Sequence, residues 1–136
     1  MYDGVLVDTS VWVSWFRRLD RPGVAELEDL LRQRRALLSD PVRMELLMGV
    51  PQKGELRFMR QLIRLEMVSV EPRADFDLAA EIHRATRRAG HTIRSSNDLL
   101  IAAVAIRTGY ALLHDDVDFE RISAVIPELR SWPIEG

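Results

Sequence analysis

The stretch VLVDTSVW, residues 5–12, decides how the rest of the chain is read, because a short apolar run leads straight into an acid and two hydroxyls. Val5–Val7 is apolar and follows a glycine, which is typical of a buried strand. Thr9 or Ser10 can cap a helix that begins at once. The apolar face of that helix would carry Trp12, Trp15, Phe16 and Leu19. What remains to be explained is why Asp8 stands where the strand ends.

Strand and helix patterns alternate along the remaining chain. Further strands are predicted at Ala36–Leu38, Met67–Val70 and Tyr110–Leu113, with an edge strand at Leu129–Trp132. Helices are predicted over residues 24–31, from Ser39 or Asp40 to 48, over 55–64 and 75–89, from Ser95 or Ser96 to 106, and after 116. In the 75–89 helix the residues expected to face inward are Phe76, Leu78, Ala79 and Ile82. Such alternation predicts a parallel sheet with helices on both faces.

Composition excludes several classes of protein. The 136 residues suffice for one domain, and we expect a single domain over residues 1–136. The absence of cysteine excludes disulfides and thiolate metal sites. The longest apolar run, LLIAAVAI at 99–106, is too short to span a membrane, and no secretory signal pattern precedes the first strand. We therefore expect a soluble cytoplasmic protein.

The charged residues are unevenly distributed. The formal net charge of −2 gives no general indication of nucleic-acid binding. All basic residues except Lys53 are arginines, and they come in groups. The groups are Arg17, Arg18 and Arg21; Arg32, Arg34 and Arg35; Arg57, Arg60 and Arg64; and Arg84, Arg87, Arg88 and Arg94. Each group is either a phosphate contact, which suits the guanidinium fork, or a solvated helix face.

Acids follow two of the predicted strands. Asp8 comes directly after Val5–Val7, and Asp115 and Asp116 come just after Tyr110–Leu113. In open α/β sheets, ligands bind beyond the carboxyl ends of the strands, at the point where the strand order reverses. If these two strands are neighbours across that point, their carboxylates converge.

Two further acids belong to predicted helices. Asp98 lies in the first turn of the most apolar helix, where the helix dipole stabilises an acid by about 0.3–1 kcal/mol. Glu45 interrupts the apolar face of the helix that ends before Gly49. Converging carboxylates repel one another unless a cation neutralises them, and an all-oxygen site suits Mg²⁺ or Mn²⁺. Setting aside Asp8, Glu45, Asp98 and Asp116 changes the formal charge from −2 to +2, as expected for an acidic pit in a mildly basic surface.

Each acid also has a purely structural interpretation. Asp8 and Asp98 could cap helices. Glu45 could pair with Arg43 or with a distant arginine, and the acids after Leu113 could form an ordinary turn. Their joint placement around one crevice favours a metal-dependent enzyme that acts on phosphate esters.

Four segments together resemble the motif set of PIN-domain nucleases, in particular the VapC-type toxins of bacterial toxin–antitoxin pairs. The segments are VDTSVW (7–12), RMELLMG (43–49), NDLLIAA (97–103) and HDDVDFERI (114–122). The resemblance covers nearly the whole chain in length, order and spacing. One VDTS would be weak evidence, whereas four motifs in register are strong.

The resemblance implies a Mg²⁺- or Mn²⁺-dependent endoribonuclease that cleaves structured RNA, commonly tRNA or rRNA, with metal-activated water. The family's catalytic and metal-binding acids correspond to Asp8, Glu45, Asp98 and Asp116. Thr9 corresponds to the hydroxyl after the first acid, and Asp118 corresponds to a further acid of the family. Asp115, directly before Asp116, is a further candidate near the site. His114 departs from the family pattern, in which many members carry Thr or Ser at this place.

The resemblance also implies a three-layer α/β/α sandwich around a parallel sheet of five strands. It further implies a homodimer, a small cognate antitoxin, and a heterotetramer or larger assembly with that antitoxin. Arg94 and Ser95, just before Asp98, could meet RNA phosphate, although solvation and helix capping explain them almost as well. The aromatic face of the first helix could be core, or part of an antitoxin or dimer groove.

Two other classes of function compete with this interpretation. A phosphoaspartyl enzyme also places an acid after the first strand, but it needs a lysine near the phosphate, and Lys53 lies in a predicted loop between helices. A catalytically silent binding module would use the acidic pocket to receive a basic partner. A thermal shift caused by divalent metal and lost in Asp98→Asn would distinguish the enzyme from the module.

Overall fold

The central strand β1 (Val5–Val7) is buried along its whole length and pairs on both sides, as its unbroken apolar sequence requires. The chain is described by a computed structural model over residues 3–49 and 55–135; Lys53 lies outside these ranges. β1 runs parallel to β2 (Ala36–Ser39) and β4 (Ala111–Leu113), and β2 runs parallel to β3 (Glu66–Val68). The strand order is β3-β2-β1-β4. The order reverses between β1 and β4, the two strands that were expected to bring their acids together.

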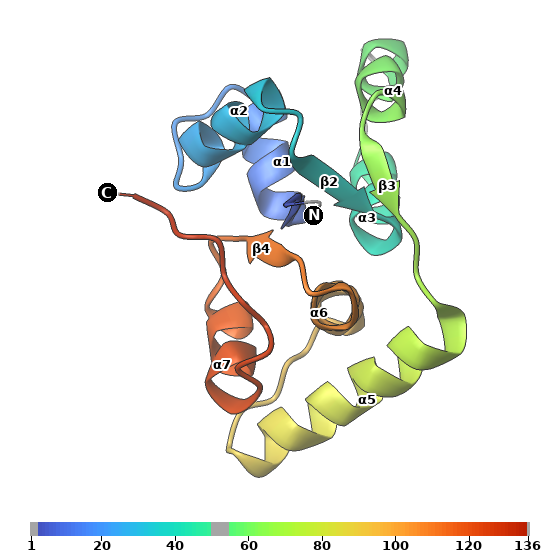
Figure 1. Ribbon diagram of the computed structural model, residues 1–136, viewed down its shortest axis with the longest axis vertical. Helices are drawn as coiled ribbons and strands as arrows, with labels where there is room; N and C mark the ends of the chain where they lie inside the picture. Colours follow the sequence, from blue (N-terminus) through green and yellow to red (C-terminus); the bar gives the residue numbers. More distant parts are fainter. Residues whose placement is uncertain (1–2, 50–54, 136) are drawn as a thin grey trace.

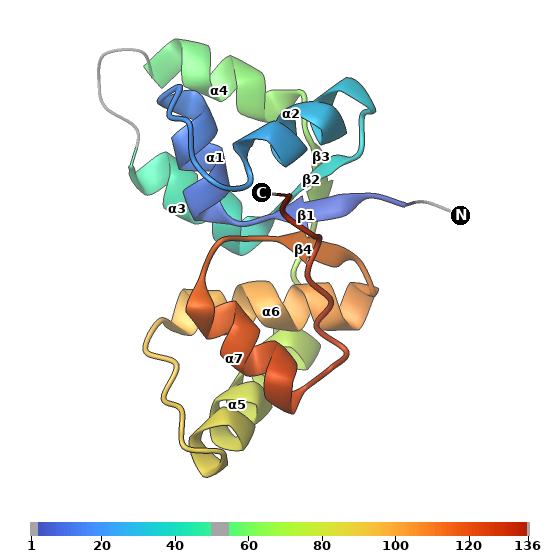
Figure 2. The same ribbon diagram turned by 90° about the vertical axis from the view of Figure 1, so that its left-hand side faces the viewer.

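Helices cover both faces of this sheet. In the described ranges they are α1 (Thr9–Phe16), α2 (Val24–Arg32), α3 (Asp40–Met48), α4 (Glu55–Ile63), α5 (Pro72–Arg88), α6 (Ser96–Thr108) and α7 (Val117–Val125). Figures 1 and 2 show α1, α2 and α4 on one side of the sheet and α5, α6 and α7 on the other. Helix α3 contacts both α1 and α6, so it joins the two layers at one end of the sheet. The predicted three-layer α/β/α fold is confirmed.

The core lies on both faces of the sheet, with α6 as its most buried helix. Residues 101–105 of α6 are all buried, which explains why this helix is apolar almost all round. On the opposite face, Trp12 is fully buried, and its indole Nε1 donates a hydrogen bond to the Val7 carbonyl at 3.1 Å. No helix in the described ranges is both long and apolar enough to cross a membrane.

The sheet of the described residues has four strands, so the expected fifth strand at Leu129–Trp132 is wrong as a full strand. This segment does run parallel to β4, but it forms a single bridge, from Leu112 to Ser131. The Leu112 amide donates to the Arg130 carbonyl, and the Leu112 carbonyl accepts from the Trp132 amide. Pro133 has no N–H to continue the ladder, which accounts for the early end of the pairing.

Several boundaries differ from the sequence-based expectation. Strand β3 ends at Val68 instead of Val70, because the Val70 amide donates to the Asp40 carboxylate and not to a neighbouring strand. Helix α5 begins at Pro72, a residue suited to the first helical position because its missing N–H needs no partner there.

Two expected core positions are also wrong. Phe76 was expected to face inward from α5, but its side chain is 55% exposed. Helix α1 ends at Phe16, so Leu19 lies beyond it and is 37% exposed instead of continuing the apolar face.

Candidate active site

Asp8 leaves the central strand at the carboxyl edge of the sheet. Its amide donates to the Leu113 carbonyl at 2.9 Å, which ties the end of β1 to the end of β4. The residue stands at the N-cap position of α1 but makes no side-chain cap bond; instead its Oδ2 accepts from Ser10 Oγ at 2.9 Å. Thr9 and Ser10, the expected caps, therefore have other roles. Asp8 therefore lies at the edge of the sheet where the ends of β1 and β4 meet.

Burial raises the pKa of Asp8 to about 6, and the charges of Glu45 and Asp116 add to the effect. Hydrogen bonds from the Ser10 hydroxyl and the Thr9 amide act in the opposite direction but do not cancel it. A carboxyl that is 4% exposed and lies near two other acids is costly to ionise. A cation bound beside Asp8 would offset the cost of ionising its carboxyl group.

Glu45 projects from α3 and is held by two donors on one of its oxygens. Its Oε1 accepts from Thr9 Oγ1 at 2.8 Å and from Asn97 Nδ2 at 2.6 Å. Asn97 also donates to the Pro41 carbonyl at 3.0 Å. Helices α1, α3 and α6 thus meet at one carboxylate, and Glu45 Oε2 has no recorded hydrogen bond to another described residue.

Asp98 lies in the first turn of α6, beneath a serine cap. The Asp98 amide donates to Ser95 Oγ at 3.2 Å, so Ser95 serves as the N-cap of this helix, the structural alternative that its sequence left open. Burial is the main cause that raises the pKa of Asp98 to about 7. The negative charges of neighbouring acids raise it further; these are Asp8, Asp116, Glu45 and Asp118. Acids from four separate parts of the chain therefore lie within electrostatic reach of one another.

Asp116 stands at the N-cap of α7, just past β4. Its Oδ1 accepts from the Asp118 amide at 2.9 Å, and its own amide donates to His114 Nδ1 at 3.3 Å. Asp118 is partly neutralised by Arg121, 3.0 Å away. Asp115 is exposed, and its recorded influence is on His114. Asp116 thus belongs to the acid cluster, whereas Asp115 points into solvent.

The sequence pattern missed three polar residues that shape this site. Asn97 fixes Glu45, Ser10 binds Asp8, and Ser131 of the C-terminal segment hydrogen-bonds to His114. Asn97 gave no separate signal in the sequence, because helix capping explains an asparagine at the start of a helix. Arg94 is exposed and lines a small cavity of about 450 Å³ between α5 and the start of α6.

The donor set fits a hard divalent cation in chemical type. All four candidate ligands are carboxylates, and every recorded influence on the pKa of Asp98 opposes its ionisation, so the site carries uncompensated negative charge. Within residues 3–49 and 55–135, however, no three Asp, Glu or His side chains are already arranged to hold an ion. Binding would require the carboxylates to draw closer together.

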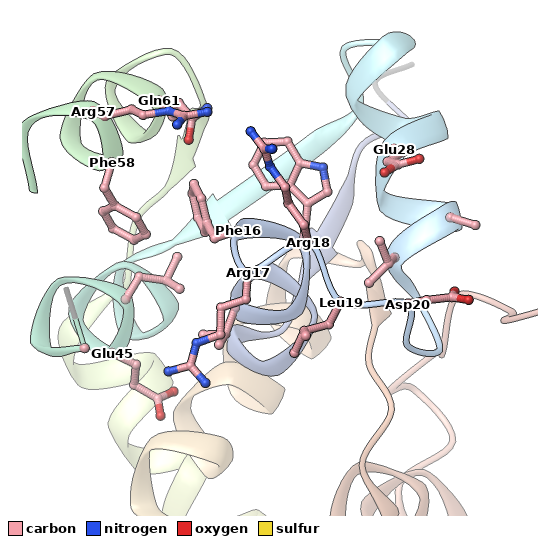
Figure 3. A pocket seen from close by; sticks show the side chains of 16 residues that line it. Phe16, Arg17, Arg18, Leu19, Asp20, Glu28, Glu45, Arg57, Phe58 and Gln61 are labelled. Atoms are coloured by element: carbon pink, nitrogen blue, oxygen red, sulfur yellow. The ribbon is translucent and has the colours of Figure 1, made fainter. Parts of the chain in front are cut away.

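A groove of about 1090 Å³ between α1, α2, α3 and α4 ends at Glu45. Phe16 and Phe58 form its apolar floor, with ring centroids 4.3 Å apart. Figure 3 shows Arg17 extending toward Glu45 at one end, while Arg57 lies at the other side of the groove. The aromatic face predicted for the first helix is therefore divided: Trp12 is core, and the later aromatic residues line the groove.

The fold is that of a known class of protein. The PIN domain family model matches residues 5–125. The chain is 40% identical over 124 residues to VapC ribonuclease Mb1587 of Mycobacterium bovis, covering 89% of this chain and 92% of that protein. Ribonuclease VapC11 of Mycobacterium tuberculosis matches equally well. The chain therefore belongs to the PIN-domain family, and within it to the VapC ribonucleases.

Solved structures agree on the fold. VapBC2 from Rickettsia felis, bound to a DNA fragment from its promoter, matches with a TM-score of 0.74 and 23% identity, over 96% of this chain and 98% of that one. FitAcB from Neisseria gonorrhoeae matches with a TM-score of 0.70 and 19% identity, over 95% and 96% of the two chains. At these identities the likeness supports the fold alone.

Proposed function

We propose that residues 1–136 act as a single PIN domain whose function is that of a Mg²⁺- or Mn²⁺-dependent endoribonuclease toxin. Its substrate is structured RNA, tRNA or rRNA, and a cognate antitoxin inhibits it. The observation that carries this proposal is the gathering of Asp8, Glu45, Asp98 and Asp116 near the carboxyl ends of β1 and β4, where burial and then the charges of the other three acids raise the pKa of Asp98. The 40% identity to named VapC ribonucleases supports the same activity.

Asp8, Asp98 and Asp116 would hold the ion, directly or through water. When bound, a divalent cation supplies positive charge beside the phosphate and makes a nearby water molecule a better nucleophile. No nucleophilic side chain is required. Asp8 is buried, and Asp98 and Asp116 are half-buried. Partial removal from water strengthens the electrostatic interactions of these acids.

Glu45 is the acid best placed to handle a proton. Because Thr9 and Asn97 both donate to Oε1, the carboxylate cannot rotate freely, and Oε2 is left to accept a hydrogen bond from the attacking water. Thr9 is thereby assigned to Glu45 rather than to the cap of α1. The role of Glu45 is to orient the attacking water beside the scissile phosphate and to accept its proton.

Contacts to the RNA backbone would come from arginines near the crevice. Arg17 lies at the Glu45 end of the groove, and Arg94 is exposed close to the start of α6. Guanidinium groups suit phosphate oxygens, and the cluster of acids alone would repel RNA. Asp115 and Asp118 lie at the rim of the acidic crevice, where they would face the RNA. The charge of Asp118 is partly neutralised by Arg121.

The direct test is cleavage of purified tRNA and rRNA in Mg²⁺ or Mn²⁺, with EDTA as the metal-free condition. We expect cleavage that EDTA stops and that Asp8→Asn abolishes. Asp77→Asn, an exposed acid on α5, is the matched control and should cleave like the unaltered protein. Undiminished cleavage by Asp8→Asn would exclude Asp8 from the site.

The groove that ends at Glu45 is the proposed antitoxin site. It offers the aromatic pair Phe16 and Phe58 for an apolar helix, and a path into the acidic crevice for a basic side chain. Phe58→Arg should weaken inhibition by a small protein encoded beside this gene while leaving RNA cleavage intact. Light scattering would test the homodimer, and the heterotetramer or larger assembly with antitoxin.

A catalytically silent binding module is the second candidate. The observation that favours it is the lack, among the described residues, of three acids already arranged to hold an ion. Such a module would receive an arginine or lysine of a partner in the acidic crevice. Absence of both metal binding and RNA cleavage would support it.

A further inference from the structure

His114 is a buried histidine with a polar partner on each ring nitrogen. It is 6% exposed and packs against the fully buried Phe119, with ring centroids 5.1 Å apart. Its Nδ1 lies 3.3 Å from the Asp116 amide nitrogen, and its Nε2 lies 2.8 Å from Ser131 Oγ. The ring therefore connects the C-terminal segment to the backbone of a candidate metal ligand.

These contacts select one tautomer. The Asp116 amide can only donate, so Nδ1 must carry a lone pair, and the ring proton must be on Nε2. That proton then points to Ser131 Oγ, which accepts it. A doubly protonated ring would set its Nδ1–H against the Asp116 N–H, so the contact requires the neutral ring.

Ser131 is itself held in place from the sheet. It forms the single bridge to Leu112 of β4, and the residues on either side of it exchange hydrogen bonds with Leu112. The position of the histidine ring is thus fixed by the end of the sheet and by the C-terminal segment together.

We propose that His114 is a positioning residue for Asp116, held in register by Ser131, and that this link sets the affinity of the acidic crevice for divalent metal. The inference rests on the proposed metal-dependent function. With its amide bonded to His114 and its Oδ1 bonded to the Asp118 amide, Asp116 is fixed at two points. That leaves Oδ2 as the carboxylate oxygen that would bind a metal ion.

Two substitutions separate the two ring contacts. An asparagine side chain can accept from the amide two residues on, as Nδ1 does, but it cannot reach Ser131. A glutamine amide can reach Ser131, as Nε2–H does, but presents no acceptor at the Nδ1 position. His114→Asn therefore keeps the Asp116 contact, His114→Gln keeps the Ser131 contact, and Ser131→Ala removes the Ser131 contact without touching His114.

Mn²⁺ binding is measured by electron paramagnetic resonance of the free ion on the full chain, alongside RNA cleavage. We expect His114→Gln to weaken Mn²⁺ binding about tenfold, the lower end of the range for residues that orient metal ligands. His114→Asn and Ser131→Ala should weaken it less, roughly threefold, because each keeps the contact to the Asp116 amide. Saturating Mn²⁺ should restore the cleavage rate of each variant to within about twofold. The ¹⁵N shifts of the ring should report the Nε2–H tautomer.

Other results would overturn the inference. Unaltered Mn²⁺ affinity in both His114→Gln and Ser131→Ala would do so, as would rates that saturating Mn²⁺ does not restore. Thermal unfolding midpoints in EDTA identify a variant that fails to fold. If a His114 variant fails to fold, the Mn²⁺ affinity of Ser131→Ala decides whether the positioning role holds. Asp116→Asn tests the proposed function separately: if it binds Mn²⁺ normally, Asp116 is not a ligand. If the unaltered protein binds no Mn²⁺, the proposed function fails and the positioning role falls with it.

Discussion

At the residue scale, Asp8 is placed where its ionisation opposes folding. Burial raises its pKa from 3.8 to about 6, so the folded protein holds the proton more tightly than the unfolded chain does. Stability from this group is therefore complete below pH 4 and is lost as the pH rises through 6. In EDTA at pH 8, Asp8→Asn should raise the free energy of unfolding by about 3 kcal/mol while abolishing cleavage.

Urea unfolding in EDTA at several pH values measures this effect. The stability difference between Asp8→Asn and the unaltered protein should shrink as the pH falls from 6 and should vanish below about pH 3, where the aspartate is protonated in both states. Asp77→Asn, on the exposed face of α5, should follow the unaltered protein at every pH. A variant of Asp8 that is less stable at pH 8 would mean that the carboxylate stabilises the fold, contrary to this expectation.

Asn97 controls the orientation of Glu45. Asn97→Ala removes one of two donors to Oε1, and Thr9→Val removes the other. A hydrogen bond to a charged group contributes about 1.5–3 kcal/mol, so we expect either change to slow cleavage about tenfold. Single-turnover kinetics at saturating Mn²⁺ measure the step. Asn97→Asp, which sets a like charge against Glu45, should be slower still; a rate equal to that of Asn97→Ala would argue that the amide acts only through packing.

Sequence and structure agree at the residue scale to differing degrees. The positions of Asp8 and Asp116 follow from strand ends, because a parallel sheet brings those ends to one edge, and β1 and β4 are indeed neighbours. Asn97 and Ser131 could not be placed in this way. Their partners lie in other elements, and only the packing of α3 on α6, and of the C-terminal segment on β4, brings them together.

At the element scale, α5 and α6 are joined by an ion pair whose acid is fully buried and whose arginine reaches solvent. Asp75 is fully buried near the start of α5, and its Oδ1 accepts from Arg107 Nε at 2.6 Å, in the last turn of α6. Arg107 also donates to the Ser69 carbonyl at 2.9 Å, and Asp75 Oδ2 accepts from the Glu71 amide. This cluster fixes the connection from β3 into α5 as well as the packing of the two helices.

Asp75→Ala should lower the free energy of unfolding by about 2 kcal/mol, because it removes a buried acceptor that serves both the Arg107 guanidinium and the Glu71 amide. The matched control is Glu81→Ala on the same helix, which breaks the exposed pair with Arg84 and should change stability by less than about 0.5 kcal/mol. Urea unfolding distinguishes them. Mn²⁺ affinity should be unchanged in both, since the pair lies at the opposite end of α6 from Asp98; equal stability of the two variants would contradict the buried role.

The end of β3 differs from the sequence-based prediction because tertiary hydrogen bonds override the local strand pattern. The sequence MVSV predicts a strand that continues to Val70. The Val70 amide instead donates to the Asp40 carboxylate, and the Ser69 carbonyl accepts from Arg107, so the strand pairing stops at Val68. Neither hydrogen bond could be inferred from spacing, because both partners are more than 25 residues away in the sequence. Helix α6, in contrast, was predictable, because its cap, apolar body and terminal Gly109 are all local.

At the scale of the whole molecule, the acidic crevice lies where the two helical layers meet. Asp8 and Glu45 come from β1 and α3, and Asp98 and Asp116 from the layer that contains α6 and α7. Mutual repulsion among these four acids works against the packing of the two layers. Metal binding would replace that repulsion with a shared attraction, so we expect metal to act on the stability of the entire domain.

The unaltered protein should therefore unfold at a higher temperature in Mn²⁺ than in EDTA. A ligand at one hundred times its dissociation constant stabilises the folded state by about 2.7 kcal/mol, which for a domain of this size corresponds to roughly 8 °C. Asp98→Asn should lose most of this shift and Asp77→Asn should retain it. A full shift in Asp98→Asn would remove Asp98 from the ligand set. No shift in the unaltered protein would favour the module that binds a basic partner, because four acids that do not bind metal need another source of positive charge.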